Sequence, residues 1–331
     1  FNSREYQGEH TINFGISPGF YITDKKEPAS SLYKKRSFAT NLQGNSYNRF
    51  YLSNLFFLEG DVLLHNFSLS FSKKTTDRET VSQKDNDSYE DRSVNVALPL
   101  LVGKGRIEPL QDARMAVYIM DQLSRRRKLT RKPSKKEIIA FAEKIAEIKN
   151  KRFFDARNRR VYEMTQLDSF LNQKGLINKA DIGYFTTMND YWMYANNPQR
   201  GSGQRISIGI EPSYQHLYNF IHQDPASGTS TKTSYKSSGY ALSGVIRYNC
   251  EKPINLYWQR SLDAELKFGR ENKSIISEYG GETNRLQVNT LVSSISYNLG
   301  WYPNSRSYYN FHLTGRYSKF FQLEDQFDSK S

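Results

Sequence analysis

The stretch NLYWQRSLDAELKFG, Asn255 to Gly269, decides the fold class because its side chains alternate in character. Six of its seven even-numbered residues are apolar, against one of its eight odd-numbered residues, Tyr257. Successive side chains of a β-strand point to opposite faces, so this period of two predicts a strand with one apolar and one polar face. The question it raises is whether the apolar face packs on a protein core or on lipid.

The same alternation recurs on both sides of a central block of the chain. It predicts nine strands, at about residues 9–23, 46–57, 62–75, 92–103, 204–220, 236–250, 255–270, 286–301 and 307–321. Long polar connections alternate with tight turns between them. The long connections are 24–45, 75–91, 222–237 and 270–284, and the turns are Glu59–Gly60, 250–254 and 302–306. Long loops at one end of the strands and short turns at the other are typical of an up-and-down barrel in an outer membrane.

We therefore predict a mainly β protein, an up-and-down antiparallel transmembrane β-barrel that carries a three-helix insertion. A closed barrel leaves no backbone group unpaired in lipid. Bacterial barrels have even strand numbers and end their chain on the periplasmic side. We thus expect the natural protein to continue beyond Ser331 and its barrel to have ten or more strands. A soluble β-sandwich shows the same alternation with its apolar face inward, and it stays open as the alternative.

Between the two groups of strands the period changes to that of a helix. Apolar residues fall three or four apart in three stripes, which predict three amphipathic helices within residues 108–175. Ser134 and Glu137 form a capping box ahead of the second stripe, and Gly175 is a plausible cap after the third. The third stripe is Val161, Met164, Leu167 and Leu171. The expected organisation is barrel strands at 1–103, a helical insertion on the periplasmic side at 104–203, and further barrel strands at 204–331.

The formal net charge of +13 is concentrated in this insertion. Residues 104–175 contain 19 Lys and Arg and 9 Asp and Glu, a difference of +10. We interpret the basic runs as a docking surface for an acidic partner or anionic lipid headgroups, and a solvated linker would show the same charge. Nucleic acid is not expected, because no aromatic residues interleave with the cations and a periplasmic position would exclude it. The candidate partner-binding residues are Arg125, Arg126, Arg127, Lys128, Arg131, Lys132, Lys149, Lys151 and Arg152.

The polar faces of the strands would line the barrel lumen. The candidate lumen-facing residues are Arg247, Asp263, Glu265, Lys267, His312 and Arg316. They would set selectivity in a channel, or they would form a salt-bridged interior that conducts nothing. Aromatic residues gather near the tight turns, where an interfacial girdle would lie. The candidate interfacial aromatics are Tyr248, Trp258, Trp301, Tyr302 and Tyr309.

The sequence offers little for catalysis or cofactor binding. The single cysteine, Cys250, excludes an internal disulfide and a cysteine-based metal cluster. His65, His216 and His312 lie on predicted strands, and no GxSxG-like elbow accompanies them. The acidic run at 85–91 lacks the glycine and spacing of a calcium loop. We therefore predict that the protein is not an enzyme and that it binds no cofactor.

Two segments of the helical block carry a resemblance. They are GKGRIEPLQDARMAVYIMDQL (103–123) and KNKRFFDARNRRVYEMTQLDSFL (149–171). Set between barrel strands, they resemble Bacteroidota outer-membrane β-barrel proteins that carry a mostly helical insertion. The resemblance implies a location in the cell envelope and supplies no activity. We expect a bacterial outer-membrane protein whose signal peptide has been removed, with outer-membrane lipid and other envelope proteins as partners.

Three functions are compatible with these features. The first is a structural or partner-binding component of an envelope complex, with the basic insertion as its docking element. The second is an outer-membrane channel or transporter whose lumen is plugged or gated by the helices. The third is a soluble basic β protein that binds nucleic acid.

Overall fold

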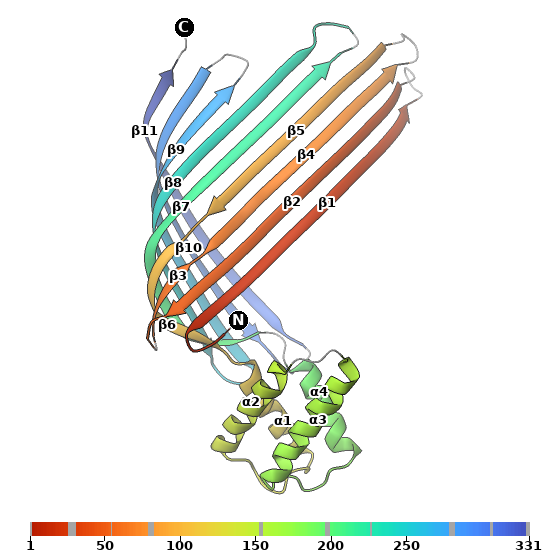
Figure 1. Cartoon of the computed structure of the whole chain (residues 1–331), viewed down its shortest axis with the longest axis vertical. Helices are drawn as coiled ribbons and strands as arrows, with labels where there is room; N and C mark the ends of the chain where they lie inside the picture. Colours follow the sequence, from red (N-terminus) through yellow and green to blue (C-terminus); the bar gives the residue numbers. More distant parts are fainter. Residues whose placement is uncertain are drawn as a thin grey trace.

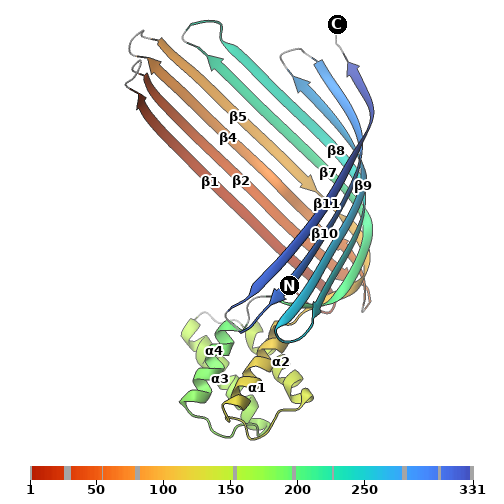
Figure 2. The same ribbon diagram turned by 180° about the vertical axis from the view of Figure 1, so that it is seen from behind.

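The computed structural model describes residues 2–25, 31–53, 55–78, 83–151, 155–195, 199–225, 227–277, 282–304 and 307–328. These residues form one antiparallel sheet and four helices (Figures 1 and 2). The strands are β1 (Tyr6–Lys25), β2 (Ser31–Tyr51), β3 (Phe56–Gly60), β4 (Val62–Arg78), β5 (Gln83–Ala97), β6 (Leu100–Pro109), β7 (Gly201–Asp224), β8 (Thr231–Pro253), β9 (Trp258–Ser277), β10 (Glu282–Trp301) and β11 (Tyr309–Asp328). The helices are α1 (Gln111–Arg125), α2 (Lys135–Asn150), α3 (Ala156–Gln173) and α4 (Ile182–Tyr194).

Two long strands of the sheet are each interrupted, and we call each long strand, with its interruption, one strand line. β3 and β4 form one line, which is broken at Asp61. β5 and β6 form another, which is broken at Leu98 and Pro99. β3 pairs with β6 while β4 pairs with β5, so the two broken lines run side by side. β7 pairs with both β5 and β6, which closes a local ring of hydrogen-bonded strands. The eleven described strands therefore follow nine lines, the number predicted from the alternation.

The sheet is strongly curved, and its two edges are β1 and β11 (Figures 1 and 2). β1 pairs with β2 and β11 pairs with β10, and no pairing in the described part of the chain joins β1 to β11. The helices lie beyond the lower end of the strands (Figure 1). We call the convex face of the sheet the outer wall and the concave face the inner wall.

The long polar connections predicted at the upper end of the strands are wrong, because most of their residues continue the strands. β2 begins at Ser31 and β5 at Gln83, well inside the predicted connections 24–45 and 75–91. Stretches in which polar residues interrupt the apolar face give a weak hydrophobic period, although their backbones still pair across the hairpin. The predicted turn at Glu59–Gly60 is also wrong. The chain reverses between Tyr51 and Phe56, and Gly60 ends β3 at the break in its line.

The helices form an up-and-down bundle inserted between β6 and β7. α1 packs on α2 and α4, and α3 packs on the same two helices. Pro109 pairs with Gly201, so the chain leaves the sheet and returns to it at one point. At the far end of the bundle, the two loops between helices meet where the Thr130 amide donates to the Leu176 carbonyl (2.9 Å).

The predicted insertion of three helices is corrected to four. The missed helix is α4, whose aromatic and Thr-rich sequence has low intrinsic helix propensity. Its signal was nonetheless present, because Asp181 caps the N-terminus through the Tyr184 amide. Tyr184, Met188 and Trp192 then follow at four-residue intervals and are buried.

The ends of the other helices follow the sequence signals closely. Ser134 and Glu137 form the predicted capping box of α2, in which each side chain accepts from the other residue's amide. Gly175 follows α3 with φ +62°, a conformation that glycine adopts without strain. One stripe residue was misplaced, since Val161 is 67% exposed whereas Leu167 and Leu171 are fully buried.

Most of the buried apolar side chains lie in the bundle, and most of the exposed ones lie on the sheet. The contiguous hydrophobic core, from Met115 to Ala195, lies in the helical segment and includes Phe141, Leu167 and Leu171 at 0% exposure. None of the described helices is both long enough and apolar enough to cross a lipid bilayer.

Candidate functional site

A cluster of ion pairs is centred on Arg247 on the inner wall. The Arg247 guanidinium contacts Glu265 of β9 at 2.8 Å and Glu211 of β7 at 3.1 Å. It also contacts Glu59 of β3 at 3.2 Å and Asp61 at 3.3 Å. β6 and β7 separate β3 from β8 in the sheet, so these contacts bridge the concave face.

Two further cations complete this Arg247 cluster. Lys267 Nζ lies 2.9 Å from Glu211 and 3.2 Å from Glu265. Arg49 of β2 contacts Glu59 at 2.5 Å. Three cations and four carboxylates thus pair with one another, beside a polar cavity of about 410 Å³. Because its members come from β2, β3, β7, β8 and β9 and from Asp61, the arrangement cross-links the inner wall.

The predicted lumen-facing residues divide into two groups. Arg247, Glu265 and Lys267 meet in the cluster, and Asp263 lies nearer the bundle, where it accepts from Asn249 Nδ2 (2.6 Å). His312 and Arg316 lie on the edge strand β11, exposed and apart from the cluster. The sequence reasoning missed Arg49, Glu59, Asp61 and Glu211. Alternation alone puts Glu211 on the polar face, whereas Glu59 was hidden by the wrongly predicted turn.

The outer wall is lined by exposed apolar side chains across its whole width. On adjacent strands near its middle, Ile208 is 56% exposed, Ile246 is 42% exposed and Leu266 is 43% exposed. Each is a direct cross-strand neighbour of the next, so the apolar surface is continuous across β7, β8 and β9. The apolar band also includes Phe14, Ile16, Phe38, Phe71, Leu242, Phe268, Ile295, Phe311 and Leu313.

Aromatic residues border the lower margin of this band. Trp258, Trp301 and Tyr309 stack across the ends of β9, β10 and β11, with ring centroids 5.9 Å and 5.3 Å apart. Tyr248 lies on the same face and donates to Gln204 Oε1 (3.1 Å). Tyr302 does not belong with them: it is 5% exposed and packs under the Arg200 guanidinium. The interfacial assignment of Tyr302 is therefore wrong, because its position just past the strand turns it inward.

Arg200 joins the bundle to the sheet. Its guanidinium donates to the carbonyls of Leu256, Asn255 and Trp258 at 2.7 to 2.9 Å, and so holds the β8–β9 turn. Leu256 of that turn packs against the bundle core. Burial lowers the pKa of Arg200, and burial together with the nearby Arg200 charge lowers the pKa of Arg114. No periodic pattern marked Arg200 in the sequence.

The basic residues of the insertion do not form one surface. The run from Arg125 to Lys132 lies at the far end of the bundle, and Lys149 and Lys151 lie at the end next to the sheet. The 16 residues of α2 separate the two groups by about 24 Å. Arg152 lies outside the described residues. The single docking patch expected from the sequence is therefore corrected to two separate groups.

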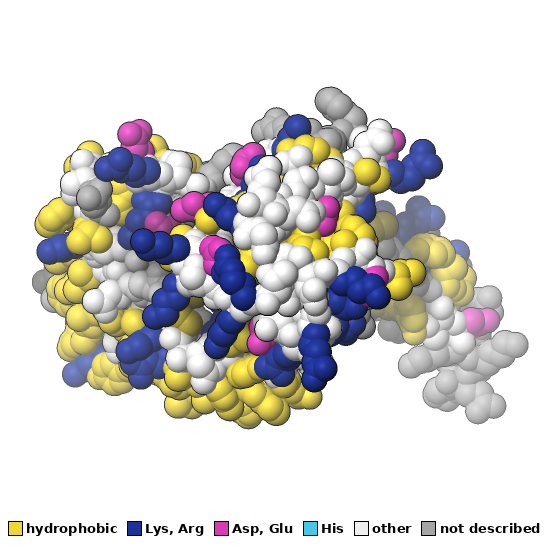
Figure 3. Space-filling model, turned by 90° about the horizontal axis from the view of Figure 1, so that it is seen from below, with side chains coloured by type: hydrophobic (Ala, Val, Ile, Leu, Met, Phe, Trp, Pro, Cys, Tyr) yellow, Lys and Arg dark blue, Asp and Glu magenta, His cyan; other side chains and the backbone are white. Residues whose placement is uncertain are grey.

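Several of these cations are engaged within the bundle. Lys128 pairs with Asp181 at 2.7 Å, Arg131 pairs with Glu137 at 2.6 Å, and Lys149 pairs with Asp112 at 2.6 Å. Arg125 pairs with Asp121 at 2.8 Å. Arg126, Arg127 and Lys132 are exposed and have no ion pair within the described part of the chain. Viewed from the bundle side, Lys and Arg outnumber Asp and Glu on the surface (Figure 3).

Three strand histidines contact a hydroxyl group. His216 Nδ1 lies 2.8 Å from Ser238 Oγ, His10 Nδ1 lies 2.8 Å from Ser46 Oγ, and His312 Nε2 lies 2.7 Å from Thr314 Oγ1. His216 and His10 each contact a direct cross-strand neighbour, whereas His312 and Thr314 lie two residues apart on β11. No group of three or more His, Cys, Asp or Glu in the described residues is arranged to hold a metal ion.

Comparison with known proteins adds no assignment. No model of a protein family matches the chain. No curated protein matches its sequence.

Proposed function

We propose that the chain is part of a bacterial outer-membrane β-barrel that acts as a structural or partner-binding component of an envelope complex. In this proposal the outer wall contacts lipid, and the helical bundle projects from the periplasmic side as the docking element. Other envelope proteins are its partners.

The observation that carries the proposal is the continuous exposed apolar face of the sheet. A soluble protein rarely exposes a contiguous apolar patch beyond a few hundred Å². Here the apolar band crosses the sheet from β1 to β11, while the ion pairs of the Arg247 cluster lie on the inner wall. A strand needs only about 9–11 residues to cross lipid, and strands of 20 to 24 residues extend well past that length.

The position of the bundle favours docking over gating. The helices lie beyond the strand ends, and Arg200 and Leu256 attach them to a single turn. The inner wall is instead occupied by the Arg247 cluster. A plug would have to place the helices against that wall.

Replacing residues 111–199 with a short Gly-Ser turn tests the two readings. Pro109 pairs with Gly201, so the replacement leaves a β6–β7 hairpin and retains Arg200. We expect the variant to reach the membrane, to lose the envelope proteins that co-purify with the parent, and to show unchanged conductance in planar bilayers. A large rise in conductance with co-purification intact would contradict docking and indicate a gate.

A finer test uses the unpaired cations at the far end of the bundle. The double variant Arg126→Gln/Arg127→Gln removes two charges there, and Lys151→Gln/Arg157→Gln removes two at the end next to the sheet. If the far end contacts the partner, the first variant should weaken co-purification and the second should not. Equal effects would show that the charges act through the field of the whole bundle.

A further inference from the structure

Two like charges face each other on the outer wall, in the half of the sheet remote from the bundle. Arg36 of β2 and Lys73 of β4 are direct cross-strand partners, and both are exposed. Like charges opposite each other destabilise a sheet. Their row continues to Phe20 on β1 and Ser88 on β5, neither of which is charged. Nothing in this row neutralises the pair.

The inner wall of the same two strands shows how such a pair can be balanced. Lys35 and Lys74 are the next cross-strand partners, and Lys74 Nζ lies 3.6 Å from Asp87. On the outer wall the nearest acids are differently placed. Glu90 is bound to Arg92, and Asp77 lines a groove that also contains Lys34, Arg36 and Lys73. Among the described side chains that line this groove, three cations therefore face one carboxylate.

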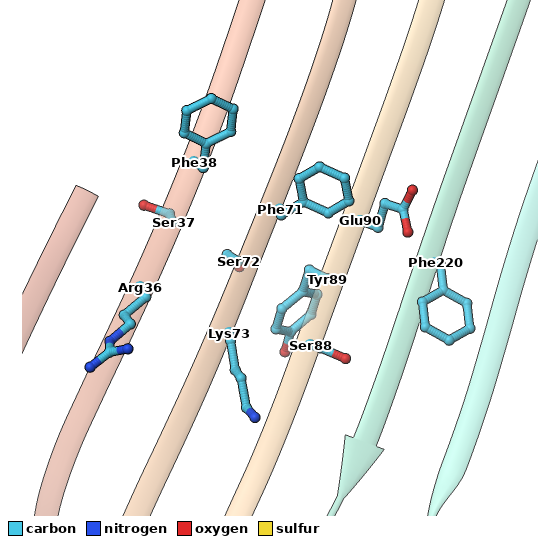
Figure 4. Close-up of a pocket in the computed structure, with 10 residues that line it drawn as sticks. All are labelled: Arg36, Ser37, Phe38, Phe71, Ser72, Lys73, Ser88, Tyr89, Glu90 and Phe220. Atoms are coloured by element: carbon cyan, nitrogen blue, oxygen red, sulfur yellow. The ribbon is translucent and has the colours of Figure 1, made fainter. Parts of the chain in front are cut away.

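Apolar rings adjoin these cations on the side toward the bundle. Phe38 and Phe71 are cross-strand partners two residues along from Arg36 and Lys73. Together with Phe220 they line a groove of about 380 Å³, in which both basic side chains extend away from the rings (Figure 4). The Arg36 guanidinium also lies over the Phe20 ring at 5.7 Å. Long basic side chains at the edge of an apolar surface place their charges at an interface.

We propose that Arg36 and Lys73 bind the phosphate-bearing headgroup of an anionic lipid, whose acyl chains lie along Phe38 and Phe71. An anion between the two cations removes their repulsion, and the adjoining rings match a ligand with an anionic head and apolar tails. Inorganic phosphate would use the cations alone. The inference rests on the proposed contact of the outer wall with lipid.

The matched variants are Arg36→Gln/Lys73→Gln on the outer wall and Lys35→Gln/Lys74→Gln on the inner wall. Each removes two charges from the same two strands at the same height. The full chain of each is reconstituted in nanodiscs of phosphatidylcholine containing phosphatidylglycerol. Lipids that stay bound are then identified by native mass spectrometry, with millimolar inorganic phosphate as a competitor.

The parent protein and the inner-wall variant should retain phosphatidylglycerol over phosphatidylcholine, and the outer-wall variant should lose that preference by roughly tenfold. Equal preference in all three proteins would overturn the site. Complete displacement of the lipid by inorganic phosphate would identify a phosphate site instead and would also overturn it. Failure of the parent to enter nanodiscs would reject the proposed membrane function itself, so the two failures are distinguishable.

Discussion

The bundle and the sheet place the same kinds of side chain in opposite environments. Phe141 and Leu171 of the bundle are fully buried, while Phe268 and Leu266 of the sheet are 58% and 43% exposed. Charged residues are reversed as well, since the bundle carries them on its surface and the sheet pairs Arg247 and Glu211 on its inner wall. The bundle buries apolar side chains in a core, whereas the sheet exposes a continuous row of them on its outer wall. The predictions below test that contrast.

The largest effect is expected from Phe141→Ala in the bundle. Truncating a fully buried ring should lower the free energy of unfolding by about 3–5 kcal/mol, because it removes buried surface and leaves a cavity. Urea denaturation in detergent, followed by the helical circular dichroism signal, measures the loss. Phe268→Ala on the outer wall is the control and should cost clearly less, since no protein cavity opens. Equal losses would mean that the outer wall packs against protein.

Introducing a charge should have different effects on stability at two exposed apolar residues, one on the outer wall and one on the bundle. Leu266→Arg on the outer wall should lower stability in lipid vesicles by about 2–4 kcal/mol, the cost of a cation on the lipid-facing side of a strand. Val161→Arg on the bundle should change it by less than about 0.5 kcal/mol, because that site faces water. Denaturant titration of the reconstituted proteins compares them. If Leu266→Arg left the stability unchanged, the outer wall would face water.

A smaller effect is expected from removing a helix cap. Ser134→Ala takes away the acceptor for the Glu137 amide and should cost about 1 kcal/mol of bundle stability. Ser124→Ala, exposed at the other end of the same inter-helix connection, is the control and should be near neutral. The helical transition reports both, and a loss of the sheet signal alone would contradict independent roles for the two regions.

The smallest effect is a dependence on pH confined to the bundle. The hydrogen bond from Lys128 holds the pKa of Asp181 below its usual value, and the Arg131 guanidinium does the same for Glu137. Carboxyls with lowered pKa values stabilise the fold above their ordinary pKa of about 4, and they lose that contribution as the pH falls through the folded value. The midpoint of helical unfolding should therefore drop on acidification. The Asp181→Asn variant keeps a capping acceptor, and its unfolding midpoint should fall less on acidification than that of the parent protein. An equal fall in both proteins would reject the role of Asp181.

Much of the fold could be predicted because its signals are local. The alternation in Asn255–Gly269 reflects strand geometry, and the Ser134 capping box reflects backbone amides that lack partners. The upper halves of the strands could not be predicted, because polar residues such as Arg36 and Thr40 interrupt the apolar positions of 31–45 and only the paired neighbour makes the segment a strand. α4 was missed because its residues form helix poorly unless packing with α1 supports them.

The candidate sites depended far more on neighbours distant in the sequence. Alternation placed Arg247, Glu265 and Lys267 on one face, but their contact with Glu59 requires the sheet to curve. The sequence predicted one basic surface, but α2 separates the run Arg125–Lys132 from Lys149 in the bundle. The sequence predicted Tyr302 to be an interfacial aromatic residue, but in the structure its ring is buried against the Arg200 guanidinium.

By itself the sequence determined the strand and helix periods, the insertion within the sheet and the concentration of positive charge in that insertion. These properties depend on side chains a few residues apart, which the chain specifies directly. Only the tertiary structure decided which cations are paired, where the bundle lies and which like charges, such as Arg36 and Lys73, become direct cross-strand partners. Such contacts join residues tens or hundreds of positions apart, and register and curvature rather than local pattern bring them together.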